Sequence, residues 1–220
     1  MALATSAESE QDAVVDADAR KAILDAAVAV IETKGLASVS MREVARLAGV
    51  SHQLPYHYFA DREGILAAIA ATGFELLGAQ LETVIDGPGT GAEKLEIAGR
   101  VYVEFACSRP AHFRVMFRND FVALDCHPAV EKCANECFAK IPLLIGQLVG
   151  EGLTPHPDET ALVLLAWSLA HGLATLILDG PLAKTKPVAA EEREATIAAV
   201  MSAMRFLIET ASKKIPAKKR

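Results

Sequence analysis

A stretch of almost unbroken apolar residues, Asp158–Asp179, constrains the fold more than any other feature of the chain. Its sequence, DETALVLLAWSLAHGLATLILD, is apolar on nearly every face of a helix. A helix that is hydrophobic all round must be buried all round. In a chain of 220 residues, one side of this helix can face its own core, and the other side needs a partner. The stretch therefore predicts a helical protein that associates through this segment.

The rest of the chain also shows helical spacing. Apolar residues between Ile23 and Ile31 recur at three- and four-residue intervals, and Gly35 follows as a stop. Aromatic residues make up only 5% of the chain, and no strand-like alternation appears. Pro142 is expected to kink a helix over 128–150. We predict an all-α fold of about nine helices, with later ones at 61–85, 92–108, 110–118, 128–150, 157–179 and 189–212.

The pattern divides the chain into four parts. Residues 1–17 are small, acidic and aperiodic, and predict a disordered arm. A three-helix domain follows over 18–78, a larger helical domain over 79–212, and a basic tail over 213–220. We expect charges to interrupt every stretch long enough to span a bilayer, so we predict no membrane contact. The N-terminus has no signal-peptide pattern, which favours a cytoplasmic protein with reduced cysteines.

The net charge of −6 argues mildly against a nucleic-acid partner, so its distribution matters. Six basic and four acidic residues lie between Arg20 and Arg62, a local balance of +2. Attraction to phosphate depends on the local potential rather than on the total charge. The overall charge therefore does not exclude DNA binding by this segment.

Two short helices and a glycine turn lie in that segment. Ser40-Met41-Arg42-Glu43 has the pattern of a capping box at a helix start. The helix ends near Ala48, Gly49 breaks it, and a second short helix begins after Ser51. This arrangement predicts a helix-turn-helix, whose second helix presents its first side chains to base edges in the major groove of DNA. The candidate DNA-binding residues are Ser40, Arg42, Ser51, His52, Gln53, Tyr56, His57 and Arg62.

The motifs over Ile23–Leu66 resemble the N-terminal domain of the tetracycline-repressor (TetR) family. The resemblance rests on Val44-Ala45-Arg46-Leu47-Ala48-Gly49-Val50-Ser51 and on Pro55-Tyr56-His57-Tyr58-Phe59-Ala60-Asp61-Arg62-Glu63. It implies a recognition helix at about Ser51–His57, with Tyr56 near a phosphate and Arg62 contacting the DNA backbone. It also implies a homodimer on a palindromic operator in double-stranded DNA. Gln53 and Pro55 depart from the family's usual residues; Gln53 is a candidate for reading adenine.

The C-terminal half resembles a subgroup of the same family with a Trp…His-Gly signature. Trp167-Ser168-Leu169-Ala170-His171-Gly172 carries that signature, and Arg109–Phe117 also fits. Trp167 and His171 are one helical turn apart, which favours an apolar effector pocket with a polar handle, or else an ordinary packed core. Small residues such as Ala199 and Ala203 favour the last helix as part of the dimer contact. The candidate ligand-binding residues are Phe105, Phe113, Phe117, Phe138, Trp167 and His171.

Other classes of function have weaker support. No arrangement of residues indicates a catalytic site, and we expect no cofactor and no metal. Gly87–Ala92 fits a loose dinucleotide pattern, but a helix rather than a strand precedes it. Two alternatives stay open. In one, the chain is a thiol- or metal-sensing regulator on the same scaffold, with Cys126, Cys133 and Cys137 as the sensing residues. In the other, it is a helical interaction module that does not bind DNA.

Overall fold

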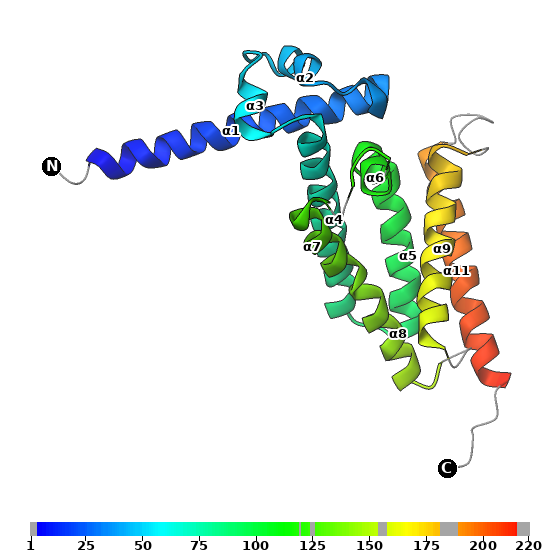
Figure 1. Cartoon of the computed structure of the whole chain (residues 1–220). Helices are drawn as coiled ribbons and strands as arrows, with labels where there is room; N and C mark the ends of the chain where they lie inside the picture. The colour runs from blue at the N-terminus through cyan, green and yellow to red at the C-terminus, as the bar shows by residue number, and fades with distance from the viewer. Residues whose placement is uncertain (1–3, 119, 124–125, 154–157, 181–188, 215–220) are drawn as a thin grey trace. The chain divides into compact units, whose positions relative to one another are not determined.

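A computed structural model describes residues 4–118, 120–123, 126–153, 158–180 and 189–214. Within these ranges the chain contains helices and no β-strand (Figure 1). The predicted all-α fold is therefore confirmed. Most of the predicted basic tail, residues 215–220, lies outside the described ranges.

The chain forms two compact units. One contains residues 1–73 and 111–131, and the other contains 74–110 and 132–220. The sequence predicts a domain boundary after residue 78, with a second domain over 79–212 and a tail over 213–220; the compact units divide the chain differently. Residues 111–131 belong instead with the first unit, which helical periodicity does not reveal because it reports an apolar face and not its partner. Helix α4 (Arg62–Asp86) contributes residues to both units.

The first unit is a group of helices around a small apolar core. α1 packs on η1, α2 and α3. The side chains at its centre are almost completely inaccessible; they are Ile23, Ala27, Val44, Ala45, Ile65 and Leu66. Its elements besides the start of α4 are α1 (Ala4–Lys34), η1 (Leu36–Ser38), α2 (Met41–Ala48), α3 (Leu54–Tyr58) and most of α6 (Pro110–Met116).

Helix α1 is longer than the sequence analysis predicts. It begins at Ala4, inside the segment expected to be a disordered arm. Residues 4–17 contain four alanines, two glutamates and one glutamine, all of which favour helices. Extending an existing helix also avoids the cost of nucleating a new one. The expectation of a disordered arm rested on the missing apolar stripe and did not include this helix propensity.

The second unit is a bundle in which α5 (Gly91–Ser108) lies in the middle. Helix α5 packs against α8 (Lys140–Gly150), α9 (Glu159–Leu178) and α11 (Ala190–Lys214), as Figure 1 shows. The side chains of Thr90 and Glu93 form a capping box at the start of α5. Gly91 allows α5 to approach the backbone of α8 closely, because a Cβ there would lie 2.8 Å from the backbone nitrogen of Leu148. The start of α5 is thereby fixed against α8.

The predicted kink at Pro142 is wrong, because the helix is interrupted before that residue. α7 (Pro128–Phe138) ends, and α8 begins at Lys140. Pro142 lies in the first turn of α8, where the missing N–H breaks no helical hydrogen bond. The proline therefore starts a new helix instead of bending an existing one.

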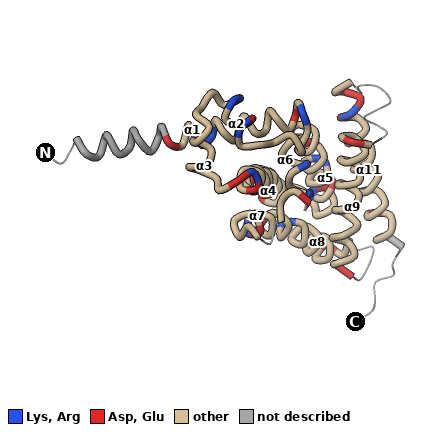
Figure 2. The backbone as a smooth tube through the Cα atoms, turned by 45° about the horizontal axis from the view of Figure 1, so that its top comes forward, with Lys and Arg blue, Asp and Glu red and all other residues tan. Residues whose placement is uncertain are grey.

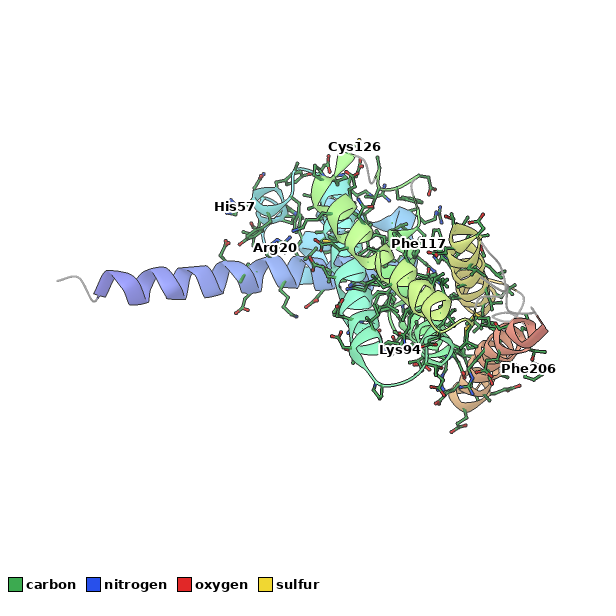
Figure 3. All side chains as sticks on the ribbon, turned by 90° about the horizontal axis from the view of Figure 1, so that it is seen from below. Arg20, His57, Lys94, Phe117, Cys126 and Phe206 are labelled. Carbon is green, nitrogen blue, oxygen red and sulfur yellow. The ribbon has the colours of Figure 1, made fainter. Side chains whose placement is uncertain are left out.

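Helices α9 and α11 bury only part of their apolar surface. Leu173 and Ala174 of α9 are buried, whereas Leu165 is 66% exposed. On α11, Phe206 and Leu207 are 66% and 67% exposed, and Figure 3 labels Phe206. Exposed apolar side chains this large, gathered on two neighbouring helices, indicate a contact surface.

Three helices, α4, α9 and α11, are long and apolar enough to cross a membrane by length and composition alone. The expectation that charges interrupt every such stretch is wrong for α9. No Asp, Glu, Lys or Arg lies between Glu159 and Asp179, as the uncoloured middle of α9 in Figure 2 shows. A helix covered on all sides by protein needs the same composition as one covered by lipid, so composition does not separate the two. The predicted absence of membrane contact stays a prediction.

Candidate nucleic-acid interface and ligand cavity

The turn between α2 and α3 is fixed by its two ends. The Ser40 hydroxyl accepts a hydrogen bond from the Glu43 N–H at 3.2 Å, which caps α2. Gly49 ends α2 in the left-handed conformation, with φ of 68°, a region that favours glycine. The predicted helix ends are therefore confirmed at Ser40 and Gly49. α3 begins at Leu54, so Gln53 occupies its N-cap position.

One side of α3 is exposed and polar, and the other is buried. Tyr56 is 56% exposed, and His57, labelled in Figure 3, is exposed as well. Pro55 and Phe59 are buried beneath them. The structure thus brings five of the predicted DNA-binding residues to one exposed segment at the start of and along α3: Ser51, His52, Gln53, Tyr56 and His57. Arg42 of α2 is exposed too.

Contacts with α1 fix the position of α3. The Tyr58 hydroxyl donates a hydrogen bond to the Asp16 carboxylate at 2.7 Å, and this bond raises the pKa of Tyr58. The Arg20 guanidinium lies over the Phe59 ring at 5.2 Å from its centroid. Tyr58 and Phe59 follow the exposed residues in sequence. Their contacts with α1 hold the exposed face of α3 in place, although neither residue is part of that face.

Arg62 lies at the start of α4 and makes its contacts within the first unit. Its Nη2 donates to the Leu36 carbonyl at 2.9 Å, and its guanidinium lies 5.2 Å from the centroid of the Phe121 ring. Its Nε is buried, with no hydrogen-bond partner in the described part of the chain. This differs from the exposed position that a DNA-backbone contact requires. Sequence reasoning missed this role because Phe121 lies about sixty residues away along the chain.

The neighbouring Glu63 binds the segment that follows α6. The Glu63 Oε1 atom accepts a hydrogen bond from the Ala123 N–H at 3.2 Å, and the same atom lies 3.2 Å from His127 Nε2. Phe121, Ala123 and His127 are therefore attached to the first turn of α4 by two consecutive side chains, Arg62 and Glu63. This attachment explains why residues 111–131 belong to the first unit.

A small apolar cavity lies in the second unit. Its volume is about 30 Å³, which has room for a water molecule but is far below that of a typical ligand pocket. Two of the predicted ligand-binding residues, Phe138 and Trp167, line it, with their rings 5.1 Å apart. The complete lining is Leu77, Leu81, Leu95, Ala98, Gly99, Tyr102, Cys137, Phe138, Ile141, Ala166, Trp167, Ala170 and Met204.

A chain of hydrogen bonds crosses the wall of this cavity. The Trp167 indole Nε1–H donates to the Tyr102 hydroxyl oxygen at 3.2 Å, and that oxygen lies 2.8 Å from His171 Nδ1. An indole N–H only donates, so the Tyr102 oxygen accepts from Trp167, whereas the direction of the hydrogen bond between neutral Tyr102 and neutral His171 depends on the imidazole tautomer. Burial raises the pKa of Tyr102 and lowers that of His171, which favours these neutral forms.

His171 is therefore expected to make the protein less stable in mild acid. Because its pKa in the folded chain lies below the usual 6.5, the unfolded chain takes up the proton first as pH falls below that value. The stabilising contribution is complete above pH 6.5 and is lost progressively below it. Thermal unfolding midpoints of the parent and of His171→Gln, measured from pH 8 to pH 5, test this; equal pH dependence of the two proteins would contradict it.

The other predicted ligand-binding aromatics lie elsewhere. Phe105 is 1% exposed and is not part of the cavity lining. Phe113 and Phe117 pack on each other at 5.1 Å in the first unit. Tyr102, which sequence reasoning missed, occupies the position between Trp167 and His171. The signal for it was weak, since one tyrosine in an apolar stripe of α5 has the pattern of an ordinary core residue.

A larger apolar groove, of about 400 Å³, adjoins the cavity. The two spaces share Leu95, Ala166 and Met204 in their walls. The groove has a floor of buried side chains, including Ile145 and Leu148, and a rim of exposed ones. The rim includes Leu165, Ala203 and Leu207, the same residues that leave α9 and α11 uncovered.

Three of the four cysteines lie where the pKa of the thiol is raised. Burial raises the pKa of Cys137 to about 12, and raises the pKa values of Cys107 and Cys133 as well. Thiols with a raised pKa contain little of the reactive thiolate at neutral pH. The described part of the chain contains no group of three or more His, Cys, Asp or Glu side chains placed to hold a metal ion.

Comparisons with known proteins agree with this geometry. HTH-type transcriptional regulator BetI from Rhizobium meliloti (strain 1021) is 51% identical over 49 residues, which are 22% of this chain and 24% of that relative. A Rhodococcus sp. RHA1 protein of unknown function has a similar structure, with a TM-score of 0.71, 24% identity, and coverage of 87% of this chain and 94% of that one. The transcriptional regulator FadR from Bacillus subtilis, solved in complex with stearoyl-CoA, has a TM-score of 0.69 and 16% identity. The match covers 87% of this chain and 98% of that one.

Two family models match the chain, one for each functional region. Residues 23–69, which contain α2, α3 and the start of α4, match the bacterial regulatory proteins of the tetR family. Residues 95–204, which supply most of the lining of the cavity and of the groove, match the tetracyclin repressor-like C-terminal domain. The chain belongs to the tetR family of bacterial regulatory proteins.

Proposed function

We propose that this chain is a cytoplasmic, homodimeric transcriptional repressor that a small apolar effector releases from its operator. The observation that supports this best is the polar, exposed face of α3 backed by buried Pro55 and Phe59. The buried back face holds the exposed polar side chains of α3 rigidly in place. In a helix-turn-helix, that rigidity places side chains against base edges.

Within this interface, Gln53 is the proposed base-reading residue. It is exposed at the N-cap of α3, and a glutamine amide can pair with adenine through two hydrogen bonds. Arg42, exposed on α2, is proposed to contact phosphate. Tyr56 and His57 extend the same surface along α3.

Replacing Gln53 with Ala is expected to remove one base preference and to leave nonspecific binding in place. The loss corresponds to about 1–3 kcal/mol at one operator position, or roughly 5- to 150-fold in affinity. Mobility-shift titrations with DNA upstream of the gene, and with single-base variants of the bound site, measure it. Gln80→Ala on α4, also an exposed glutamine, is the matched control. If the parent binds no such DNA at low salt, the proposed function itself is wrong.

A second copy of the chain is the proposed partner of the exposed apolar face on α9 and α11. Two helices from each copy would form a four-helix contact. A two-fold contact places the same residues on both sides, which suits a face made of alternating small and large apolar side chains such as Ala203 and Leu207. A two-fold dimer also matches a palindromic operator.

The effector is proposed to bind in the cavity beside Trp167 and to act through α4. Leu77 and Leu81 of α4 line that cavity, and the first turn of the same helix holds Arg62 and Glu63. A ligand that displaces the C-terminal half of α4 would change the spacing of the two recognition helices, which must be about 34–36 Å. The structure of FadR with stearoyl-CoA shows an apolar chain bound in a protein of this fold. No observation favours the cysteine-sensing alternative.

A further inference from the structure

One carboxylate of helix α2, that of Glu43, binds two cations. The Arg46 guanidinium donates from Nε to Glu43 Oε2 at 2.9 Å and from Nη2 to Glu43 Oε1 at 2.8 Å. Lys34, the last residue of α1, donates from Nζ to the same Oε1 at 2.6 Å. The side chain of Arg42, next to Glu43 on α2, has no hydrogen bond or ion pair with the residues that the structure describes. Glu43 therefore holds Lys34 and Arg46, and Arg42 stays free.

The local structure keeps the Glu43 carboxylate charged and in place. Its side chain is partly buried, whereas those of Lys34 and Arg46 are exposed. Hydrogen bonds from Arg46 and from Lys34 lower the pKa of Glu43 to about 2, so the group is ionised at neutral pH. The Glu43 N–H donates to the Ser40 hydroxyl at 3.2 Å, which fixes this residue in the first turn of α2.

The other basic side chains of the same segment also have partners. Lys21 pairs with Asp25 at 2.6 Å, and Arg20 and Arg62 make the contacts with aromatic rings described above. Between Arg20 and Arg62, Arg42 is therefore the one Lys or Arg side chain without a partner among the described residues. The first unit offers fewer free cations to DNA than its composition suggests.

The position of Glu43 matters because the first helix of a helix-turn-helix crosses the DNA backbone. A cation on that helix strengthens binding when it neutralises a phosphate and releases a counterion. A guanidinium that already shares two hydrogen bonds with a carboxylate has to give them up before it binds phosphate with the same two donors. Glu43 also subtracts one charge from the local positive potential that attracts DNA.

We propose that Glu43 competes with DNA phosphate for Lys34 and Arg46, and that it thereby limits the affinity of this protein for DNA of any sequence. This proposal rests on the proposed function and adds a residue that restrains it. Phosphate contacts carry no sequence information directly, so withholding two of them weakens nonspecific binding. Arg42 is then the cation of α2 that contacts the backbone, and recognition depends more on base contacts such as that proposed for Gln53.

Replacing Glu43 with Gln removes the charge and keeps the size of the side chain. The full-length variant should bind a labelled duplex of random sequence more tightly than the parent does, and its affinity should fall more steeply with salt. Two added phosphate contacts increase the loss of affinity between about 50 and 200 mM salt by roughly tenfold. Fluorescence anisotropy measures both quantities. Glu32→Gln is the matched control, because Glu32 is exposed on α1 and pairs with none of the described residues; it should keep the salt dependence of the parent.

Replacing Arg46 with Gln in two backgrounds shows whether Glu43 withholds this cation. In the parent, the change should leave the salt dependence as it is, because Arg46 is already bound to Glu43. In Glu43→Gln, the same change should lower the slope of log affinity against log salt by about 0.9, the value for one phosphate contact. The difference between the two backgrounds isolates the coupling of the two residues.

Two results would overturn the proposal. If Glu43 only stabilises α2, Glu43→Gln lowers the thermal unfolding midpoint and weakens DNA binding without a steeper salt dependence. If Arg46→Gln reduces the salt dependence equally in both backgrounds, Arg46 contacts phosphate in the parent and Glu43 does not withhold it; this arm needs only the parent background if Glu43→Gln fails to fold. A parent that binds no DNA at low salt contradicts the proposed function instead, so the two failures are distinguished.

Discussion

Replacing Ala203 with Glu is expected to convert the proposed dimer into monomers and to weaken operator binding more than about 100-fold. Ala203 is exposed on α11, on the rim of the apolar groove with Leu165 and Leu207. A carboxylate at this position would be buried without a cation when a second copy covers the face. An uncompensated buried charge costs about 3–5 kcal/mol, and two-fold symmetry places one on each side of the contact. Each monomer would then hold only one half-site.

Sedimentation velocity measures the change in mass, and mobility shift measures the operator affinity. Ala129→Glu is the matched control, since Ala129 is exposed on α7 and belongs to the first unit, not to the unit that contains α9 and α11. It should remain a dimer and bind the operator as the parent does. An Ala203→Glu protein that sediments as a dimer would exclude Ala203 from the contact and would require another explanation for exposed Leu165 and Leu207.

The helix-turn-helix was predictable from the sequence because its signals are local. Ser40 caps α2 through a residue three positions later, and Gly49 ends it through its own backbone conformation. Phe59 is buried next to exposed Tyr56 and His57, as a helical period requires. Contacts within one or two turns are encoded in spacing, and spacing can be read without a structure.

The ligand cavity was predictable only in part, because its residues come from distant helices. Trp167 and His171 were recognised together, since they are one turn apart on α9. Tyr102, which lies between them in space, comes from α5. Phe113 and Phe117 pack in the other unit, although their aromatic character suggested the cavity. Residue type alone does not determine which of the two cores a side chain joins. Membership of the Trp…His-Gly subgroup also rests on residue types alone, so it stays a prediction.

Arg62 is the DNA-binding candidate whose position differs most from the expectation, and its replacement by Ala should destabilise the first unit. The guanidinium donates to the Leu36 carbonyl and lies over the Phe121 ring. Losing a charged hydrogen bond and a cation–π contact costs about 2 kcal/mol or more. Operator affinity should fall as well, because the start of α4 follows directly on α3 and is held against η1 by this residue.

Arg42→Ala separates this structural role from a contact with phosphate. Arg42 is exposed on α2, so its loss should leave the thermal unfolding midpoint unchanged and reduce the salt dependence of DNA binding by about one counterion. Arg62→Ala should do the opposite: it should lower the midpoint by several degrees and keep the salt dependence of the parent. If Arg62→Ala instead keeps its midpoint and loses salt dependence as Arg42→Ala does, Arg62 contacts the DNA backbone. Its contacts with Leu36 and Phe121 would then have to be exchanged for phosphate when the operator binds.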